Sequence, residues 1–162
     1  MTAGDWEAFY AAQLGAAATL GGLVFVGLSL NLKTILTYAW LPSRALLALS
    51  VLVAILLVSS LMLIPGQTLA TLGWGIAAIG LMFFVAGTAI EVYALRNVTP
   101  QNRNAFILNL ILLELGVVPY IVGGVLIAQG EGSGFYWVAA GVIVSFVKAV
   151  LDAWVLLVEI NR

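Results

Sequence analysis

The residues that could do chemistry in this 162-residue chain are four ionisable side chains that interrupt otherwise apolar stretches. They are Glu91, Glu114, Lys148 and Asp152. If the apolar stretches lie in lipid, each isolated charge costs about 2.5–3.5 kcal/mol even on insertion scales, so the four groups should pair or lose their charge. Acids inside a membrane are typical of proton relays and cation pathways. The sequence therefore predicts an intramembrane charge cluster that serves as a proton or cation site.

The spacing of these residues places them at similar depths in a membrane. Lys148 and Asp152 are four residues apart, so they share one face of a helix. Counted from the flanking arginines at about 1.5 Å per residue, Asp152 lies about 15 Å deep, Lys148 about 21 Å and Glu114 about 16 Å. On the same count Glu91 lies about 8 Å deep. Glu114 is therefore expected to reach the face that Lys148 and Asp152 share.

The charges of this predicted cluster do not balance. Three carboxylates and one ammonium would carry a net charge of −2, which is costly in a medium of low dielectric constant. Either at least one carboxyl group is protonated, or cations and water enter the cluster. The alternative is a structural role, in which Lys148 bridges to one carboxylate and only locks the last two helices together.

Two neighbouring residues are expected to support the cluster. Asn109 lies little more than one helical turn before Glu114 and could hydrogen-bond to the same site. Pro119 removes one backbone hydrogen bond from its helix and crowds the carbonyl group of Leu115, directly after Glu114. Membranes tolerate such backbone irregularity only next to protein or water. The proline therefore favours a polar environment around Glu114.

Motifs for catalysis and for cofactors are missing from the sequence. The chain contains no Cys and no His, which excludes disulfides, thiolate nucleophiles, haem ligation and the usual zinc sites. No serine has a plausible general base, and the glycine-rich segment 130–134 is a turn rather than a phosphate-binding loop. A formal net charge of −1 gives no basic excess for a phosphate backbone. We therefore expect no enzyme, no cofactor, no metal site and no nucleic-acid partner.

The elements that must position the charged residues are membrane-spanning helices. The chain is 64% hydrophobic and only 8% charged, whereas a soluble domain is about a quarter charged. A helix needs about 20 apolar residues to cross the hydrocarbon core, and Pro65-Gly66-Gln67 divides the longest apolar run into two such helices. The sequence predicts an all-α, polytopic membrane helix bundle that forms a single domain (residues 1–162). Its five spans are expected at about 8–32, 44–64, 68–95, 104–129 and 134–160.

The basic residues predict the orientation of this bundle. With five spans, the flanking cations all fall on one side of the membrane, which the positive-inside rule makes cytoplasmic. These cations are Lys33, Arg44, Arg96, Arg103 and Arg162. We therefore expect the N-terminus outside and the C-terminus inside. The N-terminal segment carries Asp5 and Glu7 and no positive region, so it is not expected to be a cleavable signal peptide.

Aromatic residues gather at both expected interfaces. Those assigned to the outer interface are Trp6, Phe9, Tyr10, Phe135, Tyr136 and Trp137. Those assigned to the inner interface are Tyr38, Trp40, Tyr93 and Phe106. Residues 34–41 are expected to extend the first span or to lie along the inner surface. Glu159 is expected to meet Arg162 or Arg103 at that surface.

Glycines recur every seven residues within the spans and predict close helix packing. Lipid gives no hydrophobic reward for helix association, so small residues must allow the helices to approach. A period of seven keeps one face toward a neighbour in left-handed packing. The packing glycines are Gly15, Gly22, Gly73, Gly80, Gly87, Gly116, Gly123 and Gly141. They favour either tight bundling within one chain, or a stripe that forms a subunit interface or lines a pore. We therefore expect the chain to contact lipid and to associate with itself.

Three blocks of the sequence carry a resemblance to a known family. They read FYAAQLGAAATLGGLVFVGLSLNL (9–32), LPSRALLALSVLVAILLVSSLMLIPGQ (41–67) and AWVLLVEINR (153–162). They resemble a family of short bacterial integral membrane proteins of unassigned function, some members of which are labelled modulator of FtsH protease. The resemblance implies a location in the bacterial inner membrane and a membrane protein as a partner.

Two functions remain open from the sequence. The first is a homo-oligomeric channel-like or transporter-like protein with an intramembrane proton or cation site. The second is a non-catalytic accessory or modulator subunit of a larger complex, such as a membrane protease.

Overall fold

The computed structural model of the chain is built of helices throughout the part that it describes, residues 3–37, 41–96 and 103–157. A short 3-10 helix, Ala3–Trp6, leads into the first α-helix. The α-helices are α1 (Glu7–Leu30), α2 (Leu32–Thr37), α3 (Leu41–Leu63), α4 (Leu69–Arg96), α5 (Arg103–Ala128) and α6 (Ser133–Leu157). Among the described residues, five helices are long and apolar enough to cross a membrane. The predicted all-α bundle with five spans is confirmed.

The observed helices differ from the predicted spans by only a few residues at each end. The largest difference at a start is in α3, which begins at Leu41 and carries Pro42 in its first turn. Proline is well tolerated there because the first turn of a helix has no partner for the missing N–H group. This earlier start places Arg44 inside the helix, with consequences for the site. The segment after α1 forms the separate helix α2 rather than a continuation of the first span.

The turn between α3 and α4 has the form that Pro65-Gly66-Gln67 predicts. Gly66 has a positive φ of 75°, a conformation that glycine adopts without steric cost. The Gln67 side-chain amide donates a hydrogen bond of 2.7 Å to the carbonyl oxygen of Leu61, so it caps the end of α3. The Thr68 hydroxyl accepts a hydrogen bond of 3.1 Å from the backbone N–H of Thr71 at the start of α4. Both ends of the turn therefore have their exposed backbone groups satisfied.

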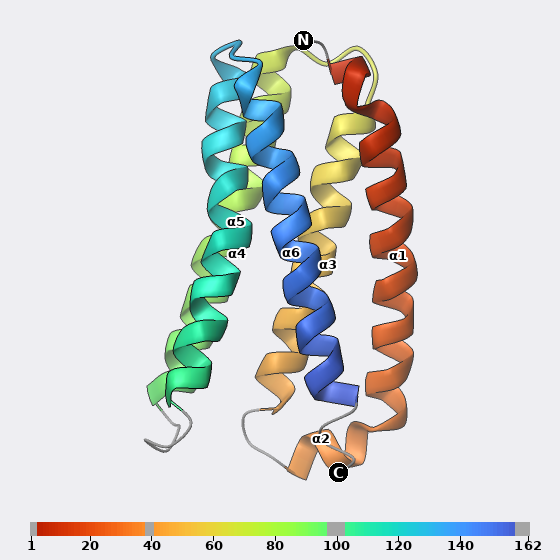
Figure 1. Ribbon diagram of the computed structural model, residues 1–162, viewed down its shortest axis with the longest axis vertical. Coiled ribbons are helices and arrows are strands. Elements are labelled where there is room, and N and C mark those ends of the chain that lie inside the picture. Colours follow the sequence, from red (N-terminus) through yellow and green to blue (C-terminus); the bar gives the residue numbers. More distant parts are fainter. Residues whose placement is uncertain (1–2, 38–40, 97–102, 158–162) are drawn as a thin grey trace.

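Figure 1 shows how the five long helices are arranged. Helices α4 and α5 lie side by side at one edge, α6 and α3 lie in the middle, and α1 forms the opposite edge, in agreement with the contacts between helices. The N-terminal end, the turn after α3 and the turn after α5 share the upper end of the view. Helix α2 lies at the lower end. We use "upper" and "lower" in this sense below.

Glycines bring α4, α5 and α6 close together. A Cβ atom added at Gly124 of α5 would lie 2.6 Å from the backbone nitrogen of Ala77 in α4. One added at Gly123 would lie 2.7 Å from the carbonyl oxygen of Gly134 in α6. Six of the predicted packing glycines lie in such contacts: Gly73, Gly80, Gly87, Gly116, Gly123 and Gly141. These three helices approach so closely because the glycines have no side chains.

Gly15 and Gly22 of α1 differ from the other predicted packing glycines. A Cβ atom added at either position would meet no atom within 4 Å. Helix α1 turns a different face to the bundle, through Tyr10, Ala17 and Val24 among others. The two glycines therefore have no packing partner within the part of the chain that the structure describes. The spacing alone could not show this, because it defines a face and not what the face contacts.

Aromatic side chains form a cluster at the upper end rather than a ring around the outside. The Trp6 ring stacks on Phe135 of α6 with their centroids 6.2 Å apart, and it meets Tyr136 edge-on at 4.9 Å. Tyr10 and Phe135 are almost fully buried, so at this end of the bundle they face the core, and their assignment to an outer membrane interface stays a prediction. Tyr38 and Trp40 lie outside the described residues.

Candidate functional site

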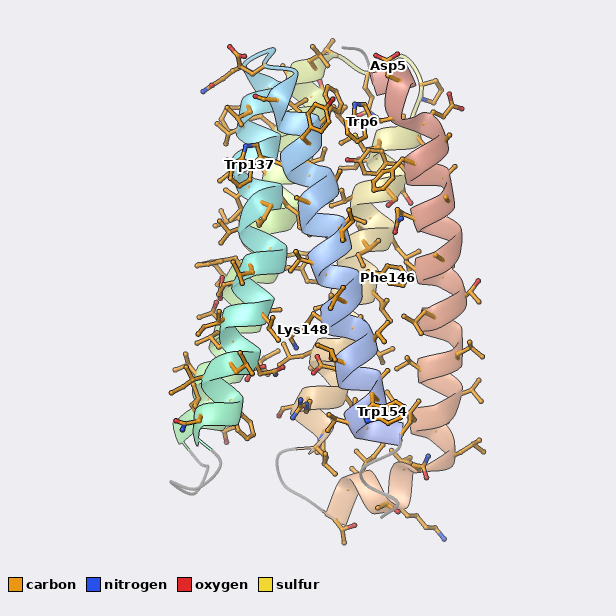
Figure 2. The ribbon with its side chains drawn as sticks, in the orientation of Figure 1. Asp5, Trp6, Trp137, Phe146, Lys148 and Trp154 are labelled. Carbon is orange, nitrogen blue, oxygen red and sulfur yellow. The ribbon has the colours of Figure 1, made fainter. Side chains whose placement is uncertain are left out.

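The centre of the candidate site is an ion pair on the inner face of α6. The Lys148 ammonium donates a hydrogen bond to the Asp152 carboxylate, as expected for residues four apart on one helix. Both side chains are only 1% exposed. Figure 2 shows Lys148 extending from α6 toward the interior between α6 and the α4–α5 pair. The predicted pairing of Lys148 with a carboxylate is present, and Asp152 is that carboxylate.

A second cation, Arg44 of α3, joins the same carboxylate. Its Nε atom lies 3.4 Å from Oδ1 of Asp152, while Lys148 binds the other oxygen of the same group. The Arg44 side chain is 20% exposed, so it connects the buried pair to the lower end of the bundle. Asp152 thus has both carboxylate oxygens occupied by cations from two different helices. The two contacts to Asp152 therefore require α3 and α6 to pack at a fixed position relative to each other.

Glu91 of α4 completes the group from the other side. It is 1% exposed and accepts a hydrogen bond from the side-chain amide of Asn109 in α5. Its carboxyl group also lies within electrostatic range of Lys148, Asp152 and Arg44. We call Arg44, Glu91, Asn109, Lys148 and Asp152 the ion network. It draws charged side chains from α3, α4 and α6 and the neutral amide of Asn109 from α5.

The composition of the ion network corrects the predicted charge balance. The sequence prediction combined three carboxyl groups with one ammonium. The structure instead brings together two acids, Glu91 and Asp152, and two bases, Lys148 and Arg44. Their formal charges sum to zero. Arg44 was assigned only to the membrane boundary, because the predicted second span began at residue 44 and Arg44 was counted among its flanking cations.

Glu114 faces a different neighbour from the one that the sequence predicts. Its Oε1 atom accepts a hydrogen bond of 2.5 Å from the Thr88 hydroxyl of α4. Within the described part of the chain, no hydrogen bond or ion pair joins Glu114 to Lys148 or Asp152. Seven residues on, Ile121 packs against Gly80 of α4, and residues seven apart share one face of a helix. Glu114 is therefore on the α4 side of α5, and its Oε2 atom is buried without a partner.

A buried hydroxyl pair extends the polar side chains from the ion network to the middle of the bundle. The Tyr120 phenol of α5 donates a hydrogen bond of 3.1 Å to the Ser145 hydroxyl of α6. Ser145, Lys148 and Asp152 lie on one face of α6, and each is 1% exposed. From Asp152 to Ser145 this polar face of α6 rises about 10 Å along the helix. Sequence reasoning missed the pair because isolated Tyr and Ser residues are common in apolar helices.

Two more buried hydroxyl groups lie in the α1 and α3 helices. Tyr10 and Ser59 are each 0% exposed, and neither hydroxyl oxygen has a hydrogen-bond partner. Tyr10 is within electrostatic range of Tyr120. A buried hydroxyl without a partner costs about 1–3 kcal/mol. Among the buried side chains that the structure describes, these are the only two hydroxyl groups without a hydrogen-bond partner.

Pro119 and the remaining predicted charges have the following positions. Pro119 lies inside α5, which is assigned as one continuous helix from Arg103 to Ala128. The residues Glu159 and Arg162 lie outside the described part of the chain. Lys33 lies in α2, at the lower end. Arg96 and Arg103 lie at the lower ends of α4 and α5, respectively.

Comparison of the chain with protein-family models, with curated protein sequences and with solved structures found no match.

Proposed function

We propose that this chain is a small membrane transport protein that moves protons through the ion network and the polar face of α6. The observation that carries the proposal is the burial of Glu91, Lys148 and Asp152, each 1% exposed, within helices apolar enough to span a membrane. Ionisable residues in such places are expensive, and they mark proton and ion pathways by default. The site is built from four helices, so small movements between the helices change the pairing of its charges.

The charge balance supports the proton over a metal cation as the transported species. Two cations, Lys148 and Arg44, contact the single carboxylate of Asp152, so no net negative charge is left there to attract a metal cation. A proton can be taken up by a carboxylate or released by an ammonium when the pairs rearrange. Glu114 supplies one further carboxyl group nearby on α5, held by Thr88.

The order of the polar groups supports a pathway from the lower end to the middle of the bundle. Arg44, 20% exposed, meets Asp152, and Asp152 meets Lys148 one turn above. Ser145 follows one turn further along the same face and bonds to Tyr120. The upper half of α6 turns apolar residues inward, Phe135 and Val138 among them. The proposed pathway is therefore a half-channel that opens at the lower end, and a proton crosses the apolar upper half only when the helices rearrange.

The exposed face of α1 supports self-association of this transport protein. Ala8, Ala12, Gly15, Thr19 and Gly22 recur at alternating spacings of four and three, and all five are exposed. This is the spacing of a left-handed helix seam, formed by small residues that allow close approach in lipid. We place a second copy of the chain against this face, so that the oligomer forms through α1.

The proposed orientation follows the positive-inside rule. The basic residues lie toward the lower end of the bundle: Lys33, Arg44, Arg96 and Arg103. The acidic residues of the upper end are Asp5, Glu7 and Glu131. The lower end then faces the cytoplasm, and the half-channel opens to that side. In a bacterium this would be the inner membrane.

Proton flux into vesicles tests the proposal. The purified protein is reconstituted in liposomes that contain a pH-sensitive dye, and valinomycin with potassium holds the membrane potential at a set value. Wild-type protein should acidify the lumen faster than protein-free vesicles do, and Asp152→Asn should lower this rate. Glu7→Gln is the matched control, because Glu7 is an exposed acid near the upper end.

A wild-type protein without flux under several ions and potentials would overturn the proposal. If such an inert protein also copurified with a stoichiometric membrane protein after gentle extraction, the accessory role would replace it.

A further inference from the structure

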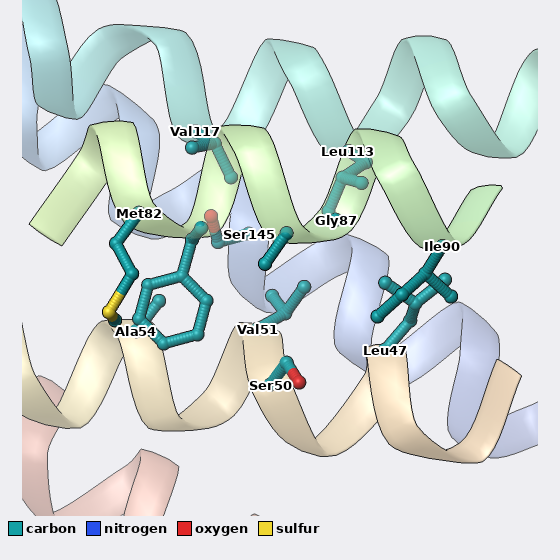
Figure 3. A pocket seen from close by; sticks show the side chains of 12 residues that line it. Leu47, Ser50, Val51, Ala54, Met82, Gly87, Ile90, Leu113, Val117 and Ser145 are labelled. Carbon is teal, nitrogen blue, oxygen red and sulfur yellow. The ribbon is translucent and has the colours of Figure 1, made fainter. Parts of the chain in front are cut away.

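A cavity opens between α3 and α4 in the middle of the bundle, apart from the ion network (Figure 3). Its volume is about 140 Å³. Val51 of α3, Met82 of α4 and Ser145 of α6 all contribute to its wall, and each lies near the middle of its own helix. In a membrane the cavity is therefore near the centre of the bilayer, where water is scarcest.

The mouth of the cavity faces the outside of the bundle. Met82 is 52% exposed, and Ala86, one turn further along α4, is also exposed. The deep wall is formed by side chains that are almost fully buried, Val51, Ala54 and Val117. The cavity thus connects the exposed surface between α3 and α4 with the core of the bundle.

The surface around the mouth is strongly apolar. Leu46 and Val53 of α3 and Leu81 and Val85 of α4 are all exposed large hydrophobic residues. The surroundings that suit such a surface at this depth are the hydrocarbon chains of the bilayer. A water-soluble ligand would have to pass through that hydrocarbon to reach the mouth.

We propose that the cavity binds the end of a hydrocarbon chain from a membrane lipid. An apolar cavity of about 150 Å³ stays dry and accepts a molecule of the size of benzene, so this cavity suits the methyl end of an acyl chain and not a headgroup. Two hydroxyl groups line it, those of Ser50 and Ser145, and Ser145 already accepts a hydrogen bond from Tyr120. The lining is otherwise apolar, which favours a hydrocarbon occupant over water.

The occupant would lie directly above the ion network. Ile90, which lines the cavity, is next to Glu91 in the sequence, and Ser145 is one turn above Lys148 on the same face of α6. A bound chain end would therefore separate the charged side chains from the lipid between α3 and α4. This lipid site does not depend on the proposed proton transport, since it rests on the cavity and its surroundings alone.

Photolabelling with a lipid that carries a diazirine near its methyl end tests the proposal. The wild-type protein is reconstituted in phosphatidylcholine vesicles containing this lipid, irradiated and digested, and the labelled residues are found by mass spectrometry. We expect label on the buried wall residues Val51, Ala54 and Val117 as well as on exposed positions such as Phe25 of α1. Label confined to exposed positions would overturn the proposal.

Variants at the mouth separate binding in the cavity from general contact with lipid. Ala86→Phe should fill the mouth and remove the label from Val51, Ala54 and Val117, while Phe25 keeps it. Ala89→Phe is the matched control, because Ala89 is exposed on the same helix and does not line the cavity; it should leave the pattern unchanged. Ser50→Phe fills the cavity from α3 and should act as Ala86→Phe does. Unchanged labelling of the wall in both filling variants would contradict the proposal.

Discussion

Arg44 and Asp152 are 108 residues apart in the sequence, yet the Arg44 Nε atom lies 3.4 Å from the Asp152 carboxylate. This contact joins the first turn of α3 to the inner face of α6 and supplies the second cation of the ion network. It changes the interpretation of the buried charges, because an apparent excess of acid becomes a balanced group of two acids and two bases. A balanced group is stable when intact and sensitive to the loss of any one charge.

The first prediction concerns that sensitivity. Lys148→Met leaves Asp152 buried with only Arg44, and removal of one partner from a buried pair typically costs about 3–5 kcal/mol. The double variant Lys148→Met/Asp152→Asn removes one base and one acid, so it should recover most of this loss. Unfolding in detergent micelles, followed by circular dichroism, measures the free energy of each variant. Equal destabilisation by the single and the double variant would contradict the balanced network.

The second prediction concerns the glycines. Gly124→Ala places a Cβ atom 2.6 Å from the backbone nitrogen of Ala77 and should destabilise the fold by about 1–3 kcal/mol, the usual cost of overpacking. Gly21→Ala is the matched control: it meets nothing within 4 Å, it is not one of the small residues of the proposed α1 interface, and it should stabilise α1 by about 0.5–1 kcal/mol through helix propensity. The same unfolding measurement applies. A tolerated Gly124→Ala would show that α4 and α5 pack less closely than described.

The third prediction concerns self-association through α1. The chain contains no cysteine, so a single introduced cysteine reports on one position. Gly22→Cys on the small exposed face should form disulfide-linked dimers in oxidised membranes. Leu81→Cys, on exposed α4, should remain monomeric under the same conditions. Dimers of both variants in equal amount, or of Leu81→Cys alone, would place the interface elsewhere.

The fourth prediction concerns orientation. In intact cells, a membrane-impermeant maleimide should label Glu131→Cys in the turn after α5. It should leave Lys33→Cys in α2 unlabelled until the membrane is permeabilised. The reason is the preference of Lys and Arg for the cytoplasmic side. The opposite pattern would reverse the bundle and the side to which the proposed half-channel opens.

The fold could be predicted closely from the sequence, because its determinants are local. Apolar runs of about 20 residues define spans, and Pro65-Gly66 ends one of them with a glycine that adopts a positive φ. The end of α3 is further fixed by the Gln67 side chain. Each of these signals acts within a few residues, and the observed helices begin and end close to the predicted positions.

The candidate site could be predicted only in part, because depth along a helix does not give direction. Counting residues placed Glu114 level with Asp152, yet Glu114 faces Thr88 of α4. Arg44 was missed for the complementary reason: α3 begins three residues before the predicted span, so Arg44 lies inside the helix and not at its boundary. The face of Gly15 and Gly22 has the same limitation, since a period of seven does not identify the neighbour. Direction depends on how all five helices pack together.

The most direct test of the proposed transport is proton flux through the double variant Lys148→Met/Asp152→Asn. This variant removes the buried pair at the centre of the ion network and leaves Arg44 and Glu91 as one base and one acid, so the network stays neutral. Its fold is checked first by circular dichroism and by elution in size-exclusion chromatography. The account predicts a folded protein whose vesicles acidify no faster than protein-free vesicles. A folded double variant that carries protons at the wild-type rate would contradict it.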